Sequence, residues 1–313
     1  MKKFLLYCFI FIIPLATMAV IVELRIRQVS NPYKYKYEWM QKNADNVETL
    51  VFGSSHTFYG IRPEFLGGNA FSLANVSQDN KQNLFLLKYW AKRYKNLKTI
   101  IVPISFSTWF GRGMEYSRES YRCRYYTIYM DCDLYLLSLP YYFELTNFGT
   151  AKMKIRKIIQ EDDKPDYDEY GWGTYYKLSK KNMTEWENGT EAEAAVKRHT
   201  AKTWNYINRN YSTLKDIADF CKKNNIQLVL ITTPCWHSYY DNLDQRQFSK
   251  MHELTDSFRK EYNLLYYDYM KDKRFVADDF YDSNHLSDIG AEKFSKLLNN
   301  DIHRKEKGAI PSK

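Results

Sequence analysis

Five short apolar runs, separated by segments of helical periodicity, constrain the fold more than any other feature of this sequence. The runs span residues 49–52, 69–73, 99–104, 226–231 and 264–268. Helices are predicted at about 79–94, 245–261 and 288–299. Strands that alternate with helices of this length form a parallel sheet through right-handed crossovers. The sequence therefore predicts an α/β, flavodoxin-like three-layer α/β/α fold with a five-stranded parallel sheet.

Residues from about 105 to 190 interrupt this alternation. They are rich in tyrosine and contain no clean strand–helix unit, although a helix is predicted at about 134–147. We interpret this stretch as an insertion, because it has too few apolar periodic segments to build a core of its own. The residues that follow, 191–224, are strongly helical.

The predicted organisation is a domain at 48–302 with this insertion, flanked by three shorter parts. These are a signal anchor at 1–27, a juxtamembrane segment at 28–47 and a disordered tail at 303–313.

The N-terminal segment carries an apolar run from Phe4 to Val22, preceded by Lys2 and Lys3. A helix of about 19 residues matches the thickness of the hydrocarbon core of a bilayer. No clean small-x-small cleavage site follows, although residues 16–19 leave cleavage open. We expect an uncleaved single-pass anchor, with the domain outside the cytoplasmic membrane, in the periplasm or on the cell surface.

Charge and cysteine content exclude several classes of protein. The net charge of +9 could suggest a nucleic-acid partner, but the basic residues are interleaved with acidic ones, so no nucleic acid is expected. Cys8 lies in the apolar run, and the remaining cysteines allow two disulfides in any of three pairings. Neither a metal nor a cofactor is predicted, because there is no Cys-x-x-Cys and the acidic stretch 161–169 lacks calcium-loop spacing.

Two motifs follow predicted strands and carry residue types that perform chemistry. Gly53 permits a tight turn after the first strand, which would raise the hydroxyl of Ser54 or Ser55 above the edge of the sheet. Asp282 and His285 lie in the loop before the last helix, where the carboxylate could hold one imidazole nitrogen. Either motif alone could be a helix cap. Both are expected at the carboxyl edge of the sheet, where open α/β sheets place their chemistry.

Together the two motifs resemble the SGNH (GDSL-like) hydrolase superfamily. The Gly-Ser-Ser variant resembles its membrane-anchored extracytoplasmic members, such as the D-alanyl-lipoteichoic acid transfer protein and the alginate O-acetyltransferases. The resemblance covers about residues 48–105 and 225–300 and leaves the insertion unmatched. It implies that Ser55 is the nucleophile, that His285 is its base and that Asp282 orients His285. His56, adjacent to Ser55, is the rival base.

The resemblance also implies an oxyanion site with three donors: the nucleophile's amide, an amide after the second strand and an asparagine after the third. Ala74 or Asn75 would supply the second donor. The third strand is followed by Ser105 in place of the family's Gly-x-Asn-Asp pattern, so either Asn75 or Ser105 would have to substitute. Loss of one donor costs about 2.7–4 kcal/mol of transition-state stabilisation, which favours a slow, dedicated acyl transferase.

The expected function is that of a membrane-anchored serine acyl transferase or esterase that uses an acyl donor. Its other partner would be a cell-surface polysaccharide or a lipid-linked glycan. Four further side chains could reach the same edge and stack on sugar rings, although core packing is the simpler interpretation of Trp109, Trp172, Trp236 and His237. The alternative function is a non-catalytic SGNH-like module that binds or assembles cell-envelope polysaccharide.

Overall fold

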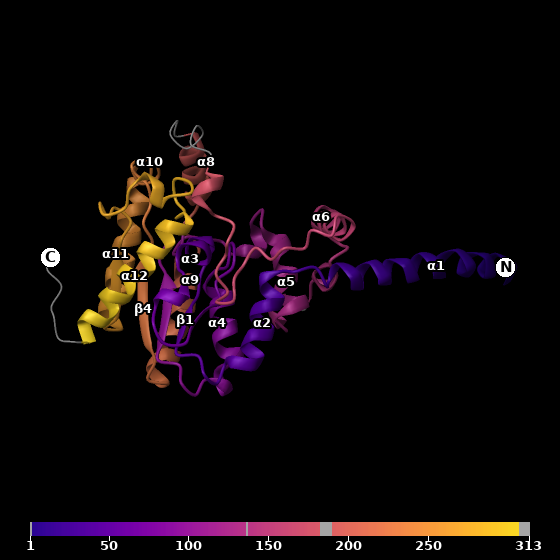
Figure 1. The fold of residues 1–313 in the computed structure, drawn as a ribbon, viewed down its shortest axis with the longest axis horizontal. Coiled ribbons are helices and arrows are strands. Elements are labelled where there is room, and N and C mark those ends of the chain that lie inside the picture. Colours follow the sequence, from indigo (N-terminus) through magenta and orange to yellow (C-terminus); the bar gives the residue numbers. More distant parts are fainter. Residues whose placement is uncertain (1, 136, 182–189, 307–313) are drawn as a thin grey trace.

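The computed structural model describes residues 2–135, 137–181 and 190–306, and its centre is a five-stranded sheet (Figure 1). The strands are β1 (Thr49–Val51), β2 (Ala70–Ser72), β3 (Thr99–Pro103), β4 (Gln227–Thr232) and β5 (Leu265–Asp268). Every neighbouring pair is parallel, and the order is β2-β1-β3-β4-β5. This is the flavodoxin-like strand order, so the predicted strands and the predicted parallel sheet are confirmed.

Helices cover both faces of the sheet because each central strand is apolar on both sides. The helices are α1 (Lys2–Ile26), α2 (Pro32–Asn43), α3 (Ser55–Gly60), α4 (Asn80–Tyr89), α5 (Cys123–Tyr129), α6 (Phe148–Ile159), α8 (Thr190–His199), α9 (Ile207–Lys223), α10 (His237–Tyr240), α11 (Gln245–Glu261) and α12 (Asp288–Glu306). Leu50 and Ile100 face the core shared with α2, α4, α9 and α11, whereas Val51 and Ile101 face α12. The domain is therefore a three-layer α/β/α structure.

The predicted helices outside the insertion match the structure closely. The predicted helix at 245–261 coincides with α11, and the last helix begins at the predicted residue 288. The last helix continues to Glu306, so the first residues of the predicted tail 303–313 are helical, while 307–313 lie outside the described residues. The predicted helix at 79–94 is α4 followed by a short 3-10 turn at Ala91–Arg93.

The helix predicted at 134–147 is wrong. The described residues there form two 3-10 turns, Asp133–Tyr135 and Leu139–Tyr142, and the helices lie on either side as α5 and α6. Pro140 explains the difference, because it has no N–H to donate and is tolerated only in the first turn of a helix. Asn147 then starts α6, since its side chain accepts a hydrogen bond from the Thr150 amide at 3.1 Å.

The segment predicted as a juxtamembrane linker at 28–47 contributes to the core of the domain. Asn31 caps α2, Pro32 occupies the first helical turn, and Met40 and Val47 are fully buried in the cluster that contains β1. The packed domain therefore begins before residue 48. Lys36 of the same helix is also fully buried and donates to the carbonyl of Ala74. Loss of solvation holds the pKa of Lys36 well below its ordinary value.

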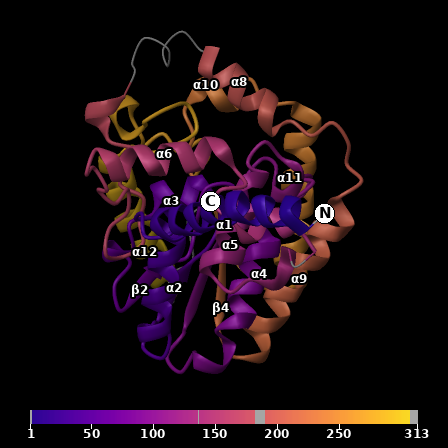
Figure 2. The ribbon, with the colours of Figure 1, turned by 90° about the vertical axis from the view of Figure 1, so that its right-hand side faces the viewer.

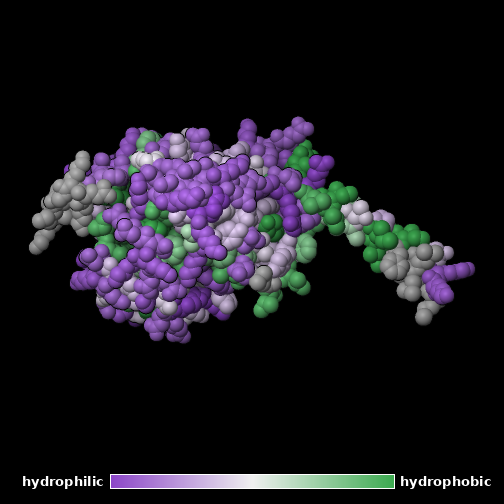
Figure 3. Space-filling view, turned by 90° about the horizontal axis from the view of Figure 1, so that it is seen from below, coloured by the Kyte–Doolittle hydropathy of each residue, from purple (hydrophilic) through white to green (hydrophobic). Residues whose placement is uncertain are grey.

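Figure 1 shows helix α1 extending away from the rest of the protein, and Figure 3 shows much of its coloured surface as apolar. Its exposed apolar side chains include Phe4, Tyr7, Ile10, Phe11, Ile12, Ile13, Leu15, Met18, Val20, Ile21 and Leu24. Across the part of the chain that the structure describes, no helix is long and apolar enough to cross a membrane. The predicted anchor at 1–27 is therefore not confirmed. Residue 1 and the side chains of residues 5, 6, 8 and 9 belong to the predicted anchor but lie outside the described part of the chain.

Cys123, Cys132, Cys221 and Cys235 are buried free thiols, so the disulfides that the sequence allowed do not form among them. Burial raises the pKa of the Cys123 thiol to about 11 and that of the Cys221 thiol to about 12. A thiol with a raised pKa holds little of the reactive thiolate at neutral pH. These buried cysteines are therefore poorly reactive and contribute to packing.

The turn after β1 requires glycine at residue 53. Gly53 has φ +117°, and a Cβ built there would lie 2.3 Å from Cγ of Pro103 at the end of β3. The chain thus passes close to β3 and then enters α3 at Ser55. This turn lies between β1 and β3, where the strand order reverses and open α/β sheets form their binding crevices.

Replacing Gly53 with alanine should lower the free energy of unfolding by about 3 kcal/mol, from backbone strain and the clash with Pro103. Chemical denaturation of the two proteins measures the difference. Gly111→Ala is the matched control, because Gly111 has no positive φ and its added Cβ would meet nothing closer than 3.4 Å. Equal stabilities of the two variants would show that the turn does not need glycine.

Candidate active site

Ser55 and His285 lie 230 positions apart in the sequence and meet at the carboxyl edge of the sheet. The Ser55 Oγ is 2.8 Å from Nε2 of His285. On the other side of the ring, Nδ1 of His285 lies 2.9 Å from each carboxylate oxygen of Asp282. The structure thus joins a hydroxyl, an imidazole and a carboxylate in one hydrogen-bonded series, which is the arrangement that activates a serine.

The loop that carries Asp282 and His285 is closed on itself. The backbone N–H groups of Asn284 and His285 donate to Oδ1 of Asp282 at 3.0 and 2.8 Å. Phe280 and Leu286 form an antiparallel bridge across the base of the loop. Burial alone would raise the pKa of the Asp282 carboxyl, but the charge of His285 and these hydrogen bonds together hold it below its ordinary value. The carboxylate therefore stays ionised beside the ring.

His56, the rival base, contacts the other serine of the pair. Its Nδ1 lies 3.2 Å from Oγ of Ser54, and its Nε2 lies 3.0 Å from Nδ2 of Asn284. Because the amide nitrogen is a donor, Nε2 accepts and Nδ1 carries the proton, so the ring is neutral. Loss of solvation, together with the charges of His285 and His199, holds the pKa of His56 well below its ordinary value. No recorded hydrogen bond joins His56 to Ser55, so among the described residues His285 is the base in reach.

His199 is a third histidine of this cluster, and the sequence analysis did not single it out. Its ring centroid lies 5.9 Å from that of His56, whose ring in turn stacks on His285 at 4.8 Å. Nδ1 of His199 is 2.7 Å from the hydroxyl of buried Tyr239. Burial, followed by the charge of His285, lowers the pKa of His199 to about 4. Nothing in the sequence marks this histidine, because it lies within an ordinary helical segment.

Three tyrosines form an aromatic stack beside the catalytic histidine candidate. The ring centroids of Tyr59 and Tyr176 are 3.9 Å apart, and those of Tyr176 and Tyr281 are 4.2 Å apart. The Tyr176 ring meets His285 edge-on at 5.1 Å. Tyr176 belongs to the insertion, so the insertion supplies one wall of the site. The sequence contains 28 tyrosines, and no local pattern distinguishes these three from the others.

The predicted oxyanion donors are engaged with other partners. The Ala74 amide donates to Oγ of Ser72 at 3.3 Å, and Nδ2 of Asn75 donates to Oε1 of Gln78 at 3.1 Å. The recorded hydrogen bonds of the Ser105 hydroxyl go to the side chains that follow it in its own turn, Ser107 and Thr108. The structure therefore does not bring Ala74, Asn75 or Ser105 into hydrogen-bond contact with Ser55.

The tryptophans and the histidine that could have reached the site divide into two groups. Trp109 and Trp172 are core residues, and their indole N–H groups donate to Thr255 and to the carbonyl of Tyr59. Trp236 lies against the Asp282 loop, because its backbone N–H donates to the carbonyl of Ser283 at 2.8 Å. His237 follows it, with its side chain largely exposed.

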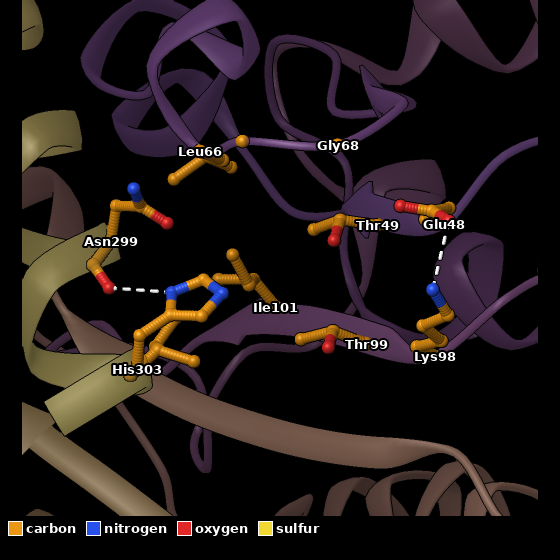
Figure 4. A pocket seen from close by; sticks show the side chains of 11 residues that line it. Glu48, Thr49, Leu66, Gly68, Lys98, Thr99, Ile101, Asn299 and His303 are labelled. Carbon is orange, nitrogen blue, oxygen red and sulfur yellow. Dashed lines mark hydrogen bonds and ion pairs between the residues drawn. The ribbon is translucent and has the colours of Figure 1, made fainter. Parts of the chain in front are cut away.

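A cavity of about 380 Å³ lies at the opposite edge of the sheet, at the amino ends of β1 and β3 (Figure 4). Glu48 and Lys98 line it and pair with each other at 2.8 Å, while His303 bonds the carbonyl of Asn299. The charges of Glu48 and Lys98 are thus paired within the protein, whereas the buried Oδ1 of Asn299 has no hydrogen-bond partner among the described residues. In the described residues no group of three or more histidine, cysteine or acidic side chains could hold a metal ion. The Ser55 edge therefore stays the candidate site.

Comparison with known proteins gives no family for the chain. No family model matches it, and no curated protein matches it. The similar solved structures include a protein provisionally described as a platelet activating factor from Streptococcus pneumonia, a provisionally described acylhydrolase from Bacteroides fragilis and a GDSL-like lipase from Bacteroides thetaiotaomicron.

The first is 9% identical, covers 94% of this chain and 98% of its own, and has a TM-score of 0.42. The second is 10% identical, covers 85% of this chain and 95% of its own, and has a TM-score of 0.41. The third is 9% identical, covers 88% of this chain and 100% of its own, and also has a TM-score of 0.41. Likenesses of this size assign neither a family nor an activity.

The pKa of His199 makes stability depend on pH in a defined window. Its folded value of about 4 lies below the ordinary value of 6.5, so the unfolded chain takes up a proton first. Stability should fall as the pH drops from about 6.5 to about 4, by at most about 1.4 kcal/mol per pH unit for this group. In His199→Asn, denaturation at several pH values should give a shallower slope across that window.

His237→Asn is the control, because it replaces an exposed histidine outside the cluster. An unchanged slope in His199→Asn would mean that His199 takes up its proton equally in the folded and unfolded chains.

Proposed function

We propose that this protein is a serine acyl transferase or esterase that works through a covalent acyl-enzyme. The observation that carries the proposal is the hydrogen-bonded series of Ser55, His285 and Asp282, with 2.8 Å between hydroxyl and imidazole. A serine hydroxyl is a weak nucleophile at neutral pH unless an adjacent base takes its proton. Here His285 is within hydrogen-bond distance of the hydroxyl, and the partly buried carboxylate of Asp282 orients the ring.

The proposed reaction has two balanced steps. Oγ of Ser55 attacks the carbonyl carbon of an acyl donor while its proton passes to Nε2 of His285. The bond to the leaving oxygen then breaks, and His285 returns the proton to that oxygen, leaving the acyl group on Ser55. In the second step His285 takes a proton from a sugar hydroxyl or from water, which attacks the ester and restores Ser55. Asp282 stabilises the imidazolium in both steps.

We propose a cell-surface glycan or glycolipid as the acceptor. The aromatic rim of the site supports this class, because Tyr175 is exposed and Tyr281 is partly exposed, and tyrosine faces suit contact with sugar rings. The resemblance of the two sequence motifs to envelope acyl transferases points to the same class. The Ser55 amide, at the start of α3, lacks an intrahelical acceptor and is the donor proposed for the oxyanion.

A second candidate function is a non-catalytic module that binds or assembles envelope polysaccharide. One observation favours this function. The donors predicted to complete the oxyanion site make hydrogen bonds to other groups of the protein; they belong to Ala74, Asn75 and Ser105. An enzyme with a single donor would lose several kcal/mol of transition-state stabilisation. The two functions differ in whether Ser55 forms a covalent bond.

We also propose that α1 holds the protein to the cytoplasmic membrane, with the domain on the outer side. Its described side chains between Ile10 and Leu24 are almost all apolar, and most are exposed to the surroundings of the domain. A cluster of exposed apolar side chains of this size is uncommon on a protein that contacts only water. Lipid is the surrounding that would cover it without a partner protein.

A fluorophosphonate probe should label the full-length protein stoichiometrically in detergent, and Ser55→Ala should abolish the labelling. Mass spectrometry of the intact protein measures the added group. Ser54→Ala is the matched control, because Ser54 is the adjacent hydroxyl and bonds His56 instead of His285. Labelling that persists in Ser55→Ala, or an unlabelled wild-type protein, would reject the acyl-enzyme and favour the binding module.

The rate of the same labelling reaction tests the base. His285→Ala should slow it by about 10⁴-fold or more, whereas Asp282→Asn should have a smaller effect, because the ring keeps its place but loses charge stabilisation. Circular dichroism of both variants controls for folding. A fast reaction in folded His285→Ala would contradict the assignment of His285 as the base.

The proposed role of α1 is tested by cell fractionation. If α1 holds the protein in the membrane, the protein should sediment with the membrane fraction and resist extraction by alkaline carbonate. Protease added to spheroplasts should degrade the domain, because the proposal places it outside the membrane. Release of the protein by carbonate would contradict the proposed attachment to the membrane. Protection of the domain from the protease would contradict its proposed place on the outer side.

A further inference from the structure

We infer that α6 and the loop before it form a membrane-contact surface, which lies on an anionic lipid bilayer beside α1. The inference rests on the proposed placement of α1 in lipid and extends it to the domain. It concerns a part of the insertion that contributes nothing to the Ser55 site, and it names the partner as the headgroup region of anionic lipids.

The first observation is the exposure of large apolar side chains on a short stretch of chain. The exposed residues are Leu137, Leu139, Phe143, Phe148, Met153, Ile158 and Ile159. Phe148 is 80% exposed and Ile159 is 76% exposed, at the two ends of α6. Soluble surfaces carry such residues singly, whereas clusters mark contact with another apolar phase.

The second observation is the pattern of α6. Phe148, Lys152, Ile155 and Ile159 are spaced by four, three and four residues and so share one face of the helix. Ala151 is buried against the domain on another face. The sequence of α6 contains four basic residues and no acidic one. Apolar and basic side chains that are exposed together on one helix suit a position in the plane of an anionic bilayer, because the lipids take up the apolar groups and attract the charges.

The third observation is that α1 and this surface form one unit. The carboxylate of Glu23, near the end of α1, accepts hydrogen bonds from the amides of Glu144 and Leu145 at 2.9 and 3.0 Å. Arg27 pairs with Glu23 and donates to the carbonyl of Tyr142 at 2.6 Å. Figures 1 and 2 show α6 running crosswise to α1 at the place where α1 leaves the domain. A helix placed along the membrane normal would thus lay α6 along the membrane surface.

A buried ion pair holds α6 in this position. Lys154 extends from α6 to the fully buried side chain of Glu144, which also accepts a hydrogen bond from Tyr129 of α5 at 2.6 Å. Lys154 is therefore used within the protein, while Lys152 and Arg156 are exposed. The exposed basic residues and the apolar ends of α6 are thus presented together, which favours an anionic lipid surface over a second copy of this basic chain.

The experiment places a polarity-sensitive fluorophore at single cysteines of the full-length protein in vesicles. The background is Cys8→Ser, in which the four other cysteines are buried. The positions are Phe148→Cys and Ile159→Cys on α6, Ile13→Cys on α1, and the control Ser257→Cys on α11, on the side of the domain away from α1 (Figure 1). The vesicles contain equal parts of phosphatidylcholine and phosphatidylglycerol, with or without a spin-labelled lipid as quencher.

Labels at 148 and 159 should shift to the blue and be quenched by the spin-labelled lipid, while the label at 257 should do neither. Both effects should be lost in vesicles of phosphatidylcholine alone and in Lys152→Glu/Arg156→Glu, whereas the label at 13 should stay quenched. If the label at residue 13 is quenched but the labels at residues 148 and 159 stay in water, this inference is wrong and the proposed placement of α1 stands. If the label at residue 13 is not quenched, the proposed placement of α1 in lipid is wrong. A blue shift at 148 without lipid quenching would show a protein partner instead, and would also overturn the inference.

Discussion

The candidate site depends on one buried contact, the hydrogen-bonded pair of Asp282 and His285. A carboxylate with little exposure is costly unless its charge is balanced and its oxygens accept hydrogen bonds. The loop meets both requirements locally, since the His285 ring and two backbone amides of the same loop face the carboxylate. The other nitrogen of the ring points to Ser55, which the Gly53 turn presents after β1 at the same edge of the sheet.

The two additional histidines explain how one ring in a cluster of three can act as the base. Among the described residues, neither His56 nor His199 has a hydrogen bond to a carboxylate. Burial holds the pKa of each ring below its ordinary value. They therefore stay neutral beside His285, which becomes positive in the proposed mechanism. Two charged neighbours at stacking distance would oppose protonation of His285. Neutral rings at this distance add no such repulsion.

The sequence was sufficient for the parts of the structure that local patterns specify. Continuous apolar runs predicted all five strands, and strand parallelism then brought the motifs of Ser55 and His285 to one edge. The remaining features depend on tertiary contacts. Tyr176 stacks on a residue over one hundred positions away, and α2 is held by a core that its own polar sequence does not indicate. The partner of the Asn75 side chain depends on such a contact too, because its amide donates to Gln78, and its predicted place in an oxyanion site stays a prediction.

The insertion contacts both the candidate active site and helix α1. One part of it holds Tyr176 against His285, and another part donates the amides that fix Glu23 of α1. Both contacts belong to a segment that packs on the domain, so the direction of α1 relative to the Ser55 edge is set by hydrogen bonds and ring packing rather than by a linker. In the proposed function, this fixed direction would set the height of Ser55 above the bilayer, and so the part of a long acceptor that arrives at the serine.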